Sequence, residues 1–446
     1  MAAVEQPAGA EEQQSENRDK LRFLLRSAAS LASTTLVTAG LGFAFWAVAA
    51  RAFPASTVGE ASTAISAMGL LAPLSVLGFG TLVMVRLPAM REGRSTLVST
   101  VTVVCGAVAS LAALICALLL PDALLGLPGV GSRPVATVVF VGVVATQAVG
   151  NLLDQALLAA HGGGIQLGRN ITQAVVKLVL LGAFALALAR FGSLNIVASW
   201  FLANAISIAG VVVLLMRRYR VSVRRALPHL SVLRGMQFDA ARHHALNTSL
   251  LMPYFVIPIV ANAVLGSEQA AYLYASWSLA GFVFFLPVAL ATALFASGAR
   301  DSRDFIMEFR FTLRFALLIC LAANLVILVF GALILGIFGE AYAQNGHLVL
   351  IVLAFGSLGT VIKDHHVTLA RVIGNEGREA VLMAVLGAGE IGGAALGAHH
   401  GGLVGLSLGW LAAVGVEVLV CGPLVWRAYR GQVEVPARGE PGGVVE

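Results

Sequence analysis

Long runs of apolar residues alternate with short polar stretches along almost the whole chain. Each run is about 20 residues or longer, the length that a helix needs to cross about 30 Å of hydrocarbon. The runs are continuously apolar and lack the alternation of barrel strands, so they predict helices. We expect about twelve membrane-spanning helices, at residues 27–50, 63–85, 96–120, 134–160, 170–190, 194–216, 244–265, 270–297, 311–337, 346–370, 380–398 and 402–426.

The composition points to lipid as the solvent of this chain. Of its 446 residues, 58% are hydrophobic and 12% are charged, and the mean hydropathy is +0.88. Soluble domains average about 45–50% apolar and about 25% charged residues. A water-soluble fold could not bury this much apolar surface. We therefore expect an all-α polytopic membrane protein.

Cationic residues are distributed unevenly over the predicted loops. The termini and the even-numbered loops hold 25 of the 29 Lys and Arg residues, and the odd-numbered loops hold Arg51, Arg133 and Arg190. Cations accumulate on the cytoplasmic side of membrane proteins. We expect both termini and all even loops in the cytoplasm, and the Arg-, Ala- and Gly-rich composition suggests a bacterial plasma membrane. Nucleic acid is not expected as a partner, because the arginines lie between apolar runs.

An internal repeat divides the chain into halves. At an offset of about 210–214 residues, Pro73 matches Pro287 and Asp154 matches Asp364. Six spans separate the copies, so the repeats are parallel, with an axis along the membrane normal. We expect two six-helix lobes around a central cavity, divided into a cytoplasmic N-terminal tail (1–26), an N-lobe (27–216), a basic cytoplasmic linker (217–243), a C-lobe (244–426) and a cytoplasmic tail (427–446).

The linker contains seven arginines and alternating apolar positions. We interpret it as an amphipathic helix on the anionic cytoplasmic leaflet. A docking site for a cytoplasmic partner is the alternative.

Two parallel lobes joined by a linker are the architecture expected for alternating access. No HExxH or Walker A motif is present in the sequence, and the potassium-filter sequence TVGYG is absent. The four cysteines all lie in or beside apolar runs, without a CxxC pair. We therefore expect a transporter rather than an enzyme or channel, with no catalytic residue, disulfide, metal site or cofactor.

Residues 41–88 carry a family resemblance. An aromatic-rich first span is followed by ARAFPASTVGEAS, and then by a Pro-containing second span that ends in GFGTLVMVRLP. This segment resembles the opening of polysaccharide biosynthesis proteins, the O-antigen-type flippases of the multidrug/oligosaccharidyl-lipid/polysaccharide (MOP) exporter superfamily. Span count, loop lengths and the repeat extend the resemblance over the whole chain.

The resemblance implies a function and a set of partners. The implied activity moves an undecaprenyl-pyrophosphate-linked glycan from the cytoplasmic to the outer leaflet. Besides the lipid bilayer and this lipid-linked glycan, glycosyltransferases or a polymerase of the same pathway are candidate partners.

Two other functions stay open. A cation-coupled exporter of drugs or metabolites would have the same fold, and by family resemblance an acidic residue in the first span would favour it. The span 27–50 has none. A membrane enzyme, such as a glycan polymerase or ligase, would need a sizeable outer loop, whereas the longest predicted one is residues 121–133.

Charges within spans are the first candidates for contacts with the cargo, because each costs about 2.5–3.5 kcal/mol at mid-helix. Lys177 and Glu390 are equivalent at an offset of 213 residues, and glycines that permit either close helix approach or local unwinding flank Glu390. Lys177 is either a snorkelling or structural residue or a cation for the pyrophosphate. We hypothesise that the two face each other across the cavity, as a gate pair or as separate phosphate and proton sites. Glu417, equivalent to Asn204, is either a protonated carboxyl bonded inside its lobe or a coupling-ion site.

The span 134–160 has a polar stripe on one helical face, formed by Gln147, Asn151, Asp154 and Gln155. This face either lines the cavity or forms hydrogen bonds to neighbouring helices. Arg86 and Arg371 each end a predicted span. We interpret these two arginines as interfacial anchors and keep both as candidate ligand contacts.

Overall fold

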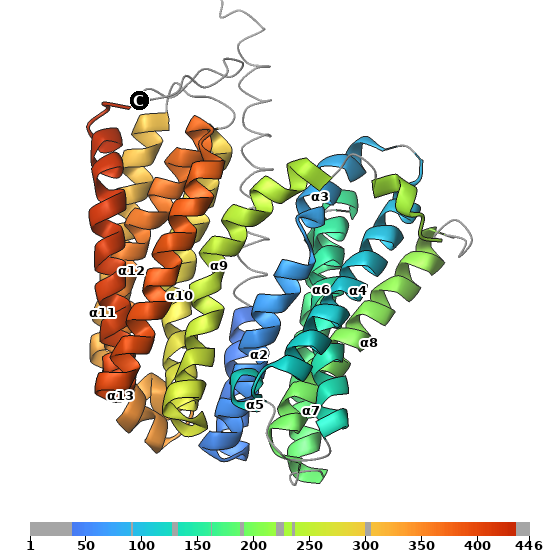
Figure 1. Cartoon of the computed structure of the whole chain (residues 1–446), viewed down its shortest axis with the longest axis horizontal. Helices are drawn as coiled ribbons and strands as arrows, with labels where there is room; N and C mark the ends of the chain where they lie inside the picture. The colour runs from blue at the N-terminus through green and yellow to red at the C-terminus, as the bar shows by residue number, and fades with distance from the viewer. Residues whose placement is uncertain are drawn as a thin grey trace, which may run out of the picture.

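The computed structural model describes residues 38–90, 92–126, 133–161, 163–187, 191–219, 227–233, 237–298 and 305–433. Within these ranges the chain is almost entirely helical (Figure 1). The predicted N-terminal tail, the first part of the first span (27–37) and residues 434–446 of the predicted C-terminal tail lie outside the described residues.

The first half of the chain forms one bundle (Figure 1). It consists of a helix at residues 38–52, α2 (Ala55–Ser75), α3 (Phe79–Ala89), α4 (Arg94–Leu119), α5 (Asp122–Leu125), α6 (Arg133–His161), α7 (Gly163–Ala187) and α8 (Ser193–Tyr219). We call it the N-lobe. Helices lie at each predicted span of this half over the described residues, and the largest difference is at α2, which begins eight residues before the predicted start at 63. Helix α7 begins seven residues before its predicted start at 170.

The second half forms a neighbouring bundle, the C-lobe (Figure 1). It consists of α9 (Gln237–Leu265), α10 (Ser267–Gly298), α11 (Phe305–Gly336), α12 (Glu340–Ile373) and α13 (Glu376–Tyr429). In the described part of the chain nine helices are long and apolar enough to cross a membrane, and the bent pair α2–α3 adds a tenth. The chain is therefore a polytopic all-α membrane protein.

Helix α13 contains two of the predicted spans. Its 54 residues have non-helical backbone angles at Gly401 and Gly402, so it is two helices joined by a sharp break. The two arms are in backbone contact: a Cβ on Gly397 would lie 2.0 Å from the carbonyl oxygen of Gly405, and one on Gly409 would lie 2.1 Å from that of Gly393. The predicted close approach of helices beside Glu390 is thus confirmed, because only glycine lets backbones pack at this distance.

The second predicted span is broken. Helices α2 and α3 meet at 55°. Pro73 lies in the last turn of α2, and Leu77 and Gly78 follow with φ angles of 51° and 74°. Proline removes a backbone donor and the left-handed residues end the helix. Its repeat partner Pro287 lies within the continuous helix α10, so the two prolines have different consequences.

The linker contacts the N-lobe. A single 3₁₀ turn forms at Leu230–Leu233, the side chain of Val232 packs beside α4, and the backbone N–H of His229 donates to the hydroxyl oxygen of Thr100 over 2.9 Å. Helix α9 already begins at Gln237, within the predicted linker. The predicted amphipathic helix falls partly on 220–226 and 234–236, outside the described residues; over 227–233 the prediction of an α-helix is wrong.

Candidate functional site

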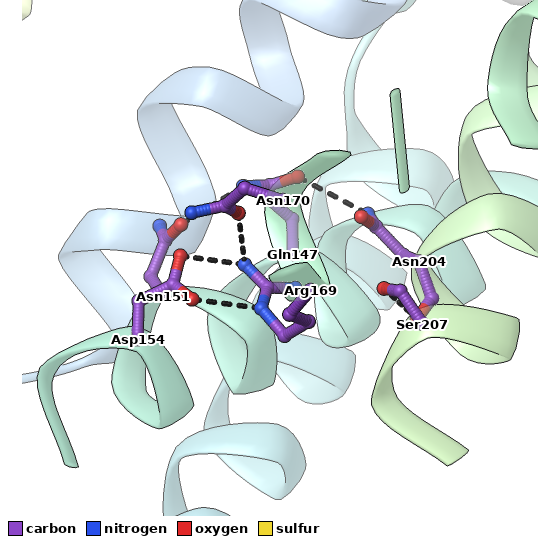
Figure 2. Close-up of polar contacts among 7 residues, drawn as sticks. All are labelled: Gln147, Asn151, Asp154, Arg169, Asn170, Asn204 and Ser207. Atoms are coloured by element: carbon purple, nitrogen blue, oxygen red, sulfur yellow. Dashed lines mark hydrogen bonds and ion pairs between the residues drawn. The ribbon is translucent and has the colours of Figure 1, made fainter. Parts of the chain in front are cut away.

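The polar face of α6 forms hydrogen bonds to neighbouring helices (Figure 2). The guanidinium of Arg169 donates to both carboxylate oxygens of Asp154, over 2.7 and 2.5 Å, and also to the side-chain oxygen of Asn170. Arg169 is one of the 25 cations predicted in the termini and the even loops. The structure places it within α7 with its side chain buried, so that prediction is wrong for Arg169. Since Asp154 and Arg169 are fifteen residues apart, only the folding of α7 back onto α6 pairs them.

The same face also reaches α8. The side-chain amide of Asn204 donates to the oxygen of Gln147 over 3.1 Å, and the amide of Gln147 donates to the oxygen of Asn151 over 2.8 Å (Figure 2). Of the two interpretations of the polar stripe, the structure shows interhelical hydrogen bonding. These side chains therefore join α6 to α7 and to α8.

Lys177 lies near the middle of α7 with its side chain inside the N-lobe, only 4% exposed. Its ammonium lies 3.7 Å from the ring centroid of Trp200 and 4.8 Å from that of Phe45. Among the described residues no carboxylate pairs with it, so cation–π attraction stabilises its charge. The indole N–H of Trp200 is likewise buried without a hydrogen-bond partner in this part of the chain.

The C-lobe contains a buried ion cluster. The ammonium of Lys363 lies 2.7 Å from a carboxylate oxygen of Glu390 and 3.0 Å from one of Glu417. The indole N–H of Trp410 donates to the second oxygen of Glu390 over 2.6 Å. We call these four residues the Lys363 cluster. When both carboxyls are ionised it carries one net negative charge.

Lys363 is not among the residues predicted for the site, because it belongs to the cations assigned to the cytoplasmic loops. The structure places it well inside α12, beside α13. A signal was available, because position 363 falls inside the predicted span 346–370. Trp410, Trp200 and Phe45 were also missed, since an aromatic residue in a span has no distinguishing pattern.

The structure does not bring Lys177 and Glu390 together. Glu390 is paired with Lys363 in the C-lobe, and Lys177 is caged by aromatic rings in the N-lobe. The repeat is nevertheless visible, because Trp200 and Trp410 are 210 residues apart and each lies against the charged side chain of the preceding span. The two lobes thus place opposite charges at equivalent positions.

The two predicted anchors differ in their surroundings. Arg86 is exposed in the last turn of α3. Arg371, in the last turn of α12, donates to the side-chain oxygen of Asn247 over 2.8 Å and therefore ties α12 to α9. Neither lies in the Lys363 cluster or beside Lys177.

The cysteines and histidines form no metal centre in the described part of the chain. All four cysteines are free. No group of three or more His, Cys, Asp or Glu side chains within the described ranges could hold a metal ion. His366 instead pairs with Glu379 over 3.3 Å, joining α12 to α13.

The lobes touch at the end that the charge distribution predicts to face outward. The rings of Trp46 and Tyr274 have centroids 4.6 Å apart. The guanidinium of Arg51 donates to the carbonyl oxygens of Gly336 and Ile337, over 2.7 and 2.9 Å. These carbonyls end α11, where unpaired acceptors and the helix dipole favour a cation. Arg51 therefore links the first helix of the N-lobe to the C-lobe.

We predict that Arg51→Ala lowers the population of this closed arrangement about fivefold, because an exposed charged contact contributes about 1 kcal/mol or less. Spin labels at the exposed positions Ser56 and Ala341, one in each lobe, would report a larger share of long distances. Arg133→Ala is the matched control, since Arg133 pairs with Asp122 over 3.7 Å within one lobe. Equal distance distributions for both variants would contradict the role of Arg51.

Solved transporter structures superimpose on almost the whole chain. Lipid II flippase MurJ in an inward closed conformation matches with a TM-score of 0.68 and 11% identity, over 90% of this chain and 90% of that chain. An inward-facing multidrug resistance MATE family transporter of the MOP superfamily matches with 0.64 and 15%, over 90% and 96%. A MOP superfamily transporter from Pyrococcus furiosus gives 0.62 and 15%, over 90% and 96%. The chain has the MOP fold.

The MOP fold is shared here by proteins with different cargo. Among the matched structures are a lipid flippase and a multidrug resistance transporter. No protein-family model matches the sequence, and no curated protein matches it. The likeness is therefore one of fold, and the function has to be inferred from the residues.

Proposed function

We propose that the protein moves a polyprenyl-pyrophosphate-linked oligosaccharide from the inner to the outer leaflet of the bacterial plasma membrane, by alternating access between the two lobes. The lipid tail can stay in the bilayer, whereas the sugars and the pyrophosphate need a polar path with at least one cation. The MOP fold supports the rocking of one lobe against the other. Glycosyltransferases or a polymerase of the same pathway would supply or use the cargo.

One observation carries the proposal: inside the N-lobe a buried cation lies beside a buried indole N–H that has no acceptor in the described chain. The ammonium of Lys177 lies over the rings of Trp200 and Phe45, and the indole N–H is that of Trp200. An unsatisfied buried donor is costly, and a cation next to it favours an anion with several acceptor oxygens. A pyrophosphate has this chemistry. In the C-lobe the equivalent indole is already bonded to Glu390.

The Lys363 cluster is proposed as the coupling site. Two buried carboxylates face one ammonium, so a proton or another cation is required for neutrality. If the Lys363 cluster bound this proton or cation in one conformation of the lobes and released it in the other, the ion gradient would drive transport in one direction. This assigns Glu390 and Glu417 to coupling, and Lys177 to the cargo.

We predict that Lys177→Met lowers flipping about tenfold or more, because charge-assisted hydrogen bonds contribute about 1.5–3 kcal/mol. The measurement is the amount of lipid-linked intermediate that accumulates on the inner leaflet, together with surface polysaccharide. Val179→Met, at an exposed position of the same helix, is the matched control. Normal flipping by Lys177→Met at a normal protein level would refute the cargo role of Lys177.

Deletion of the protein separates the proposed function from drug export. A flippase of this kind requires that the deletion strain lose surface polysaccharide and accumulate the inward-facing intermediate. A drug exporter instead predicts intact polysaccharide and increased sensitivity to cationic drugs. The absence of an acidic residue at 38–52 of the first helix favours the flippase.

A further inference from the structure

We propose that the C-lobe binds the headgroup of an anionic phospholipid at the corner where the start of α11 meets the end of α13. Five side chains form this corner: Arg310 and Arg314 from α11, and Trp426, Tyr429 and Arg430 from the end of α13. We call it the arginine corner. The loop charges predict that it lies at the cytoplasmic surface. It is separate from Lys177 and from the Lys363 cluster.

Three guanidinium groups are held in place at the arginine corner. Arg310 donates through Nε to the carbonyl oxygen of Tyr429 over 2.6 Å, and Arg314 donates through Nε to the hydroxyl oxygen of Tyr429 over 2.7 Å. The guanidinium of Arg430 lies 4.8 Å from the ring of Trp426, which stacks on Tyr429 with an interplanar angle of 9°. These contacts orient the three cations, so little side-chain entropy is lost when an anion binds.

Every one of these contacts is to a neutral group. A carbonyl, a phenol and two aromatic rings orient the guanidiniums without neutralising them. Across the described ranges none of the three arginines forms an ion pair with a carboxylate. Like charges held close together repel each other, so a shared anion stabilises the arrangement. Guanidinium groups bind phosphate oxygens in forked pairs of hydrogen bonds, which suits a phosphodiester.

An apolar track leads to the arginine corner along α11. Phe311, Phe315 and Leu318 are exposed, with 64% of Phe311 accessible, and the two phenylalanine rings stack at 5.7 Å. Positions 311, 315 and 318 share one helical face. Exposed apolar side chains on a spanning helix face acyl chains. A phosphate next to such a track is the arrangement of a phospholipid, whereas a soluble anion would use the arginines alone.

The N-lobe lacks this arrangement. In the N-lobe the positions equivalent to Trp426 and Tyr429, 210 residues earlier, hold Met216 and Tyr219. The positions equivalent to Arg310 and Arg314, 212 residues earlier, hold Val98 and Thr102. Cations that only set the membrane topology would be expected at equivalent positions of both lobes. The membrane topology therefore does not account for the arginine corner. The N-lobe end instead offers a matched control, because α8 ends in Arg217 and Arg218.

The test uses the full chain purified in nanodiscs that contain phosphatidylglycerol and phosphatidylcholine, with retained lipid measured by native mass spectrometry. We expect the wild type to retain phosphatidylglycerol selectively. Arg310→Gln with Arg314→Gln should weaken that retention about 30-fold, since each cation near the surface contributes about a factor of five. Arg217→Gln with Arg218→Gln should leave it within about twofold. Equal loss in both double variants, or equal retention of phosphatidylcholine by the wild type, would overturn the proposal.

Two further measurements distinguish loss of lipid binding from misfolding, and a bound phospholipid from a soluble anion. Phe311→Ala with Phe315→Ala leaves all three arginines in place, and we expect it to weaken lipid retention by about tenfold. Unchanged retention in this variant would contradict the apolar track. Inorganic phosphate should not displace the lipid at concentrations where phosphatidylglycerol competes fully. Displacement by phosphate at equal potency would assign the arginine corner to a free anion and overturn the lipid.

Discussion

Replacement of Lys363 by methionine is expected to destabilise the folded protein by about 3–5 kcal/mol, because it leaves two buried carboxylates without their cation. The ammonium lies 2.7 Å from Glu390 and 3.0 Å from Glu417, and both carboxyl side chains are almost fully buried. Methionine keeps the volume of the lysine stem, so the loss reflects charge rather than a cavity. Thermal unfolding in detergent, followed by circular dichroism, measures the effect.

A triple variant is the control for this prediction. Adding Glu390→Gln and Glu417→Gln to Lys363→Met removes the uncompensated charge, and stability should return nearly to that of the wild type. The indole N–H of Trp410, which donates to Glu390 over 2.6 Å, can still donate to a glutamine oxygen. If Lys363→Met alone unfolded at the wild-type temperature, the ammonium would not be holding the carboxylates, and the coupling role of the Lys363 cluster would lose its basis.

Gly59→Val is expected to lower transport about five- to a hundredfold while the protein still folds. A Cβ on Gly59 of α2 would lie 1.6 Å from the carbonyl oxygen of Ser267, at the start of α10. The clash is with backbone, so one helix must move away from the other. Overpacking costs about 1–3 kcal/mol, and here the cost falls on the conformation in which the lobes touch.

The measurement combines lipid-linked intermediate on the inner leaflet with the distance between spin labels at Ser56 and Ala341. Gly182→Val is the matched control, because a Cβ at Gly182 of α7 meets nothing within 4 Å. We expect normal transport and an unchanged distance for the control, and a longer distance for Gly59→Val. A variant at Gly59 that transports normally would show that the contact between α2 and α10 is not part of the cycle.

Several features of the fold could be read from particular residues. The spans were predicted because an apolar run of sufficient length is a local property, and lipid requires that each run satisfy its own backbone as a helix. The break after Pro73 was not predicted, because its repeat partner Pro287 lies in a continuous helix and a proline is tolerated where neighbouring helices support it. The glycines around Glu390 correctly indicated a close helix contact.

The partners of the intramembrane charges could not be read in the same way. Lys177 and Glu390 occupy equivalent positions in the sequence repeat, and for that reason we hypothesised that they face each other across the cavity. In the structure Glu390 is bonded to Lys363, and Lys177 lies against Trp200. The amino-acid pattern thus specified how many apolar helices form and which of them carry costly charges. Which charge meets which depends on helix rotation and on which faces pack together. Those are settled by the sum of many contacts between distant segments, and they leave no mark at any single position.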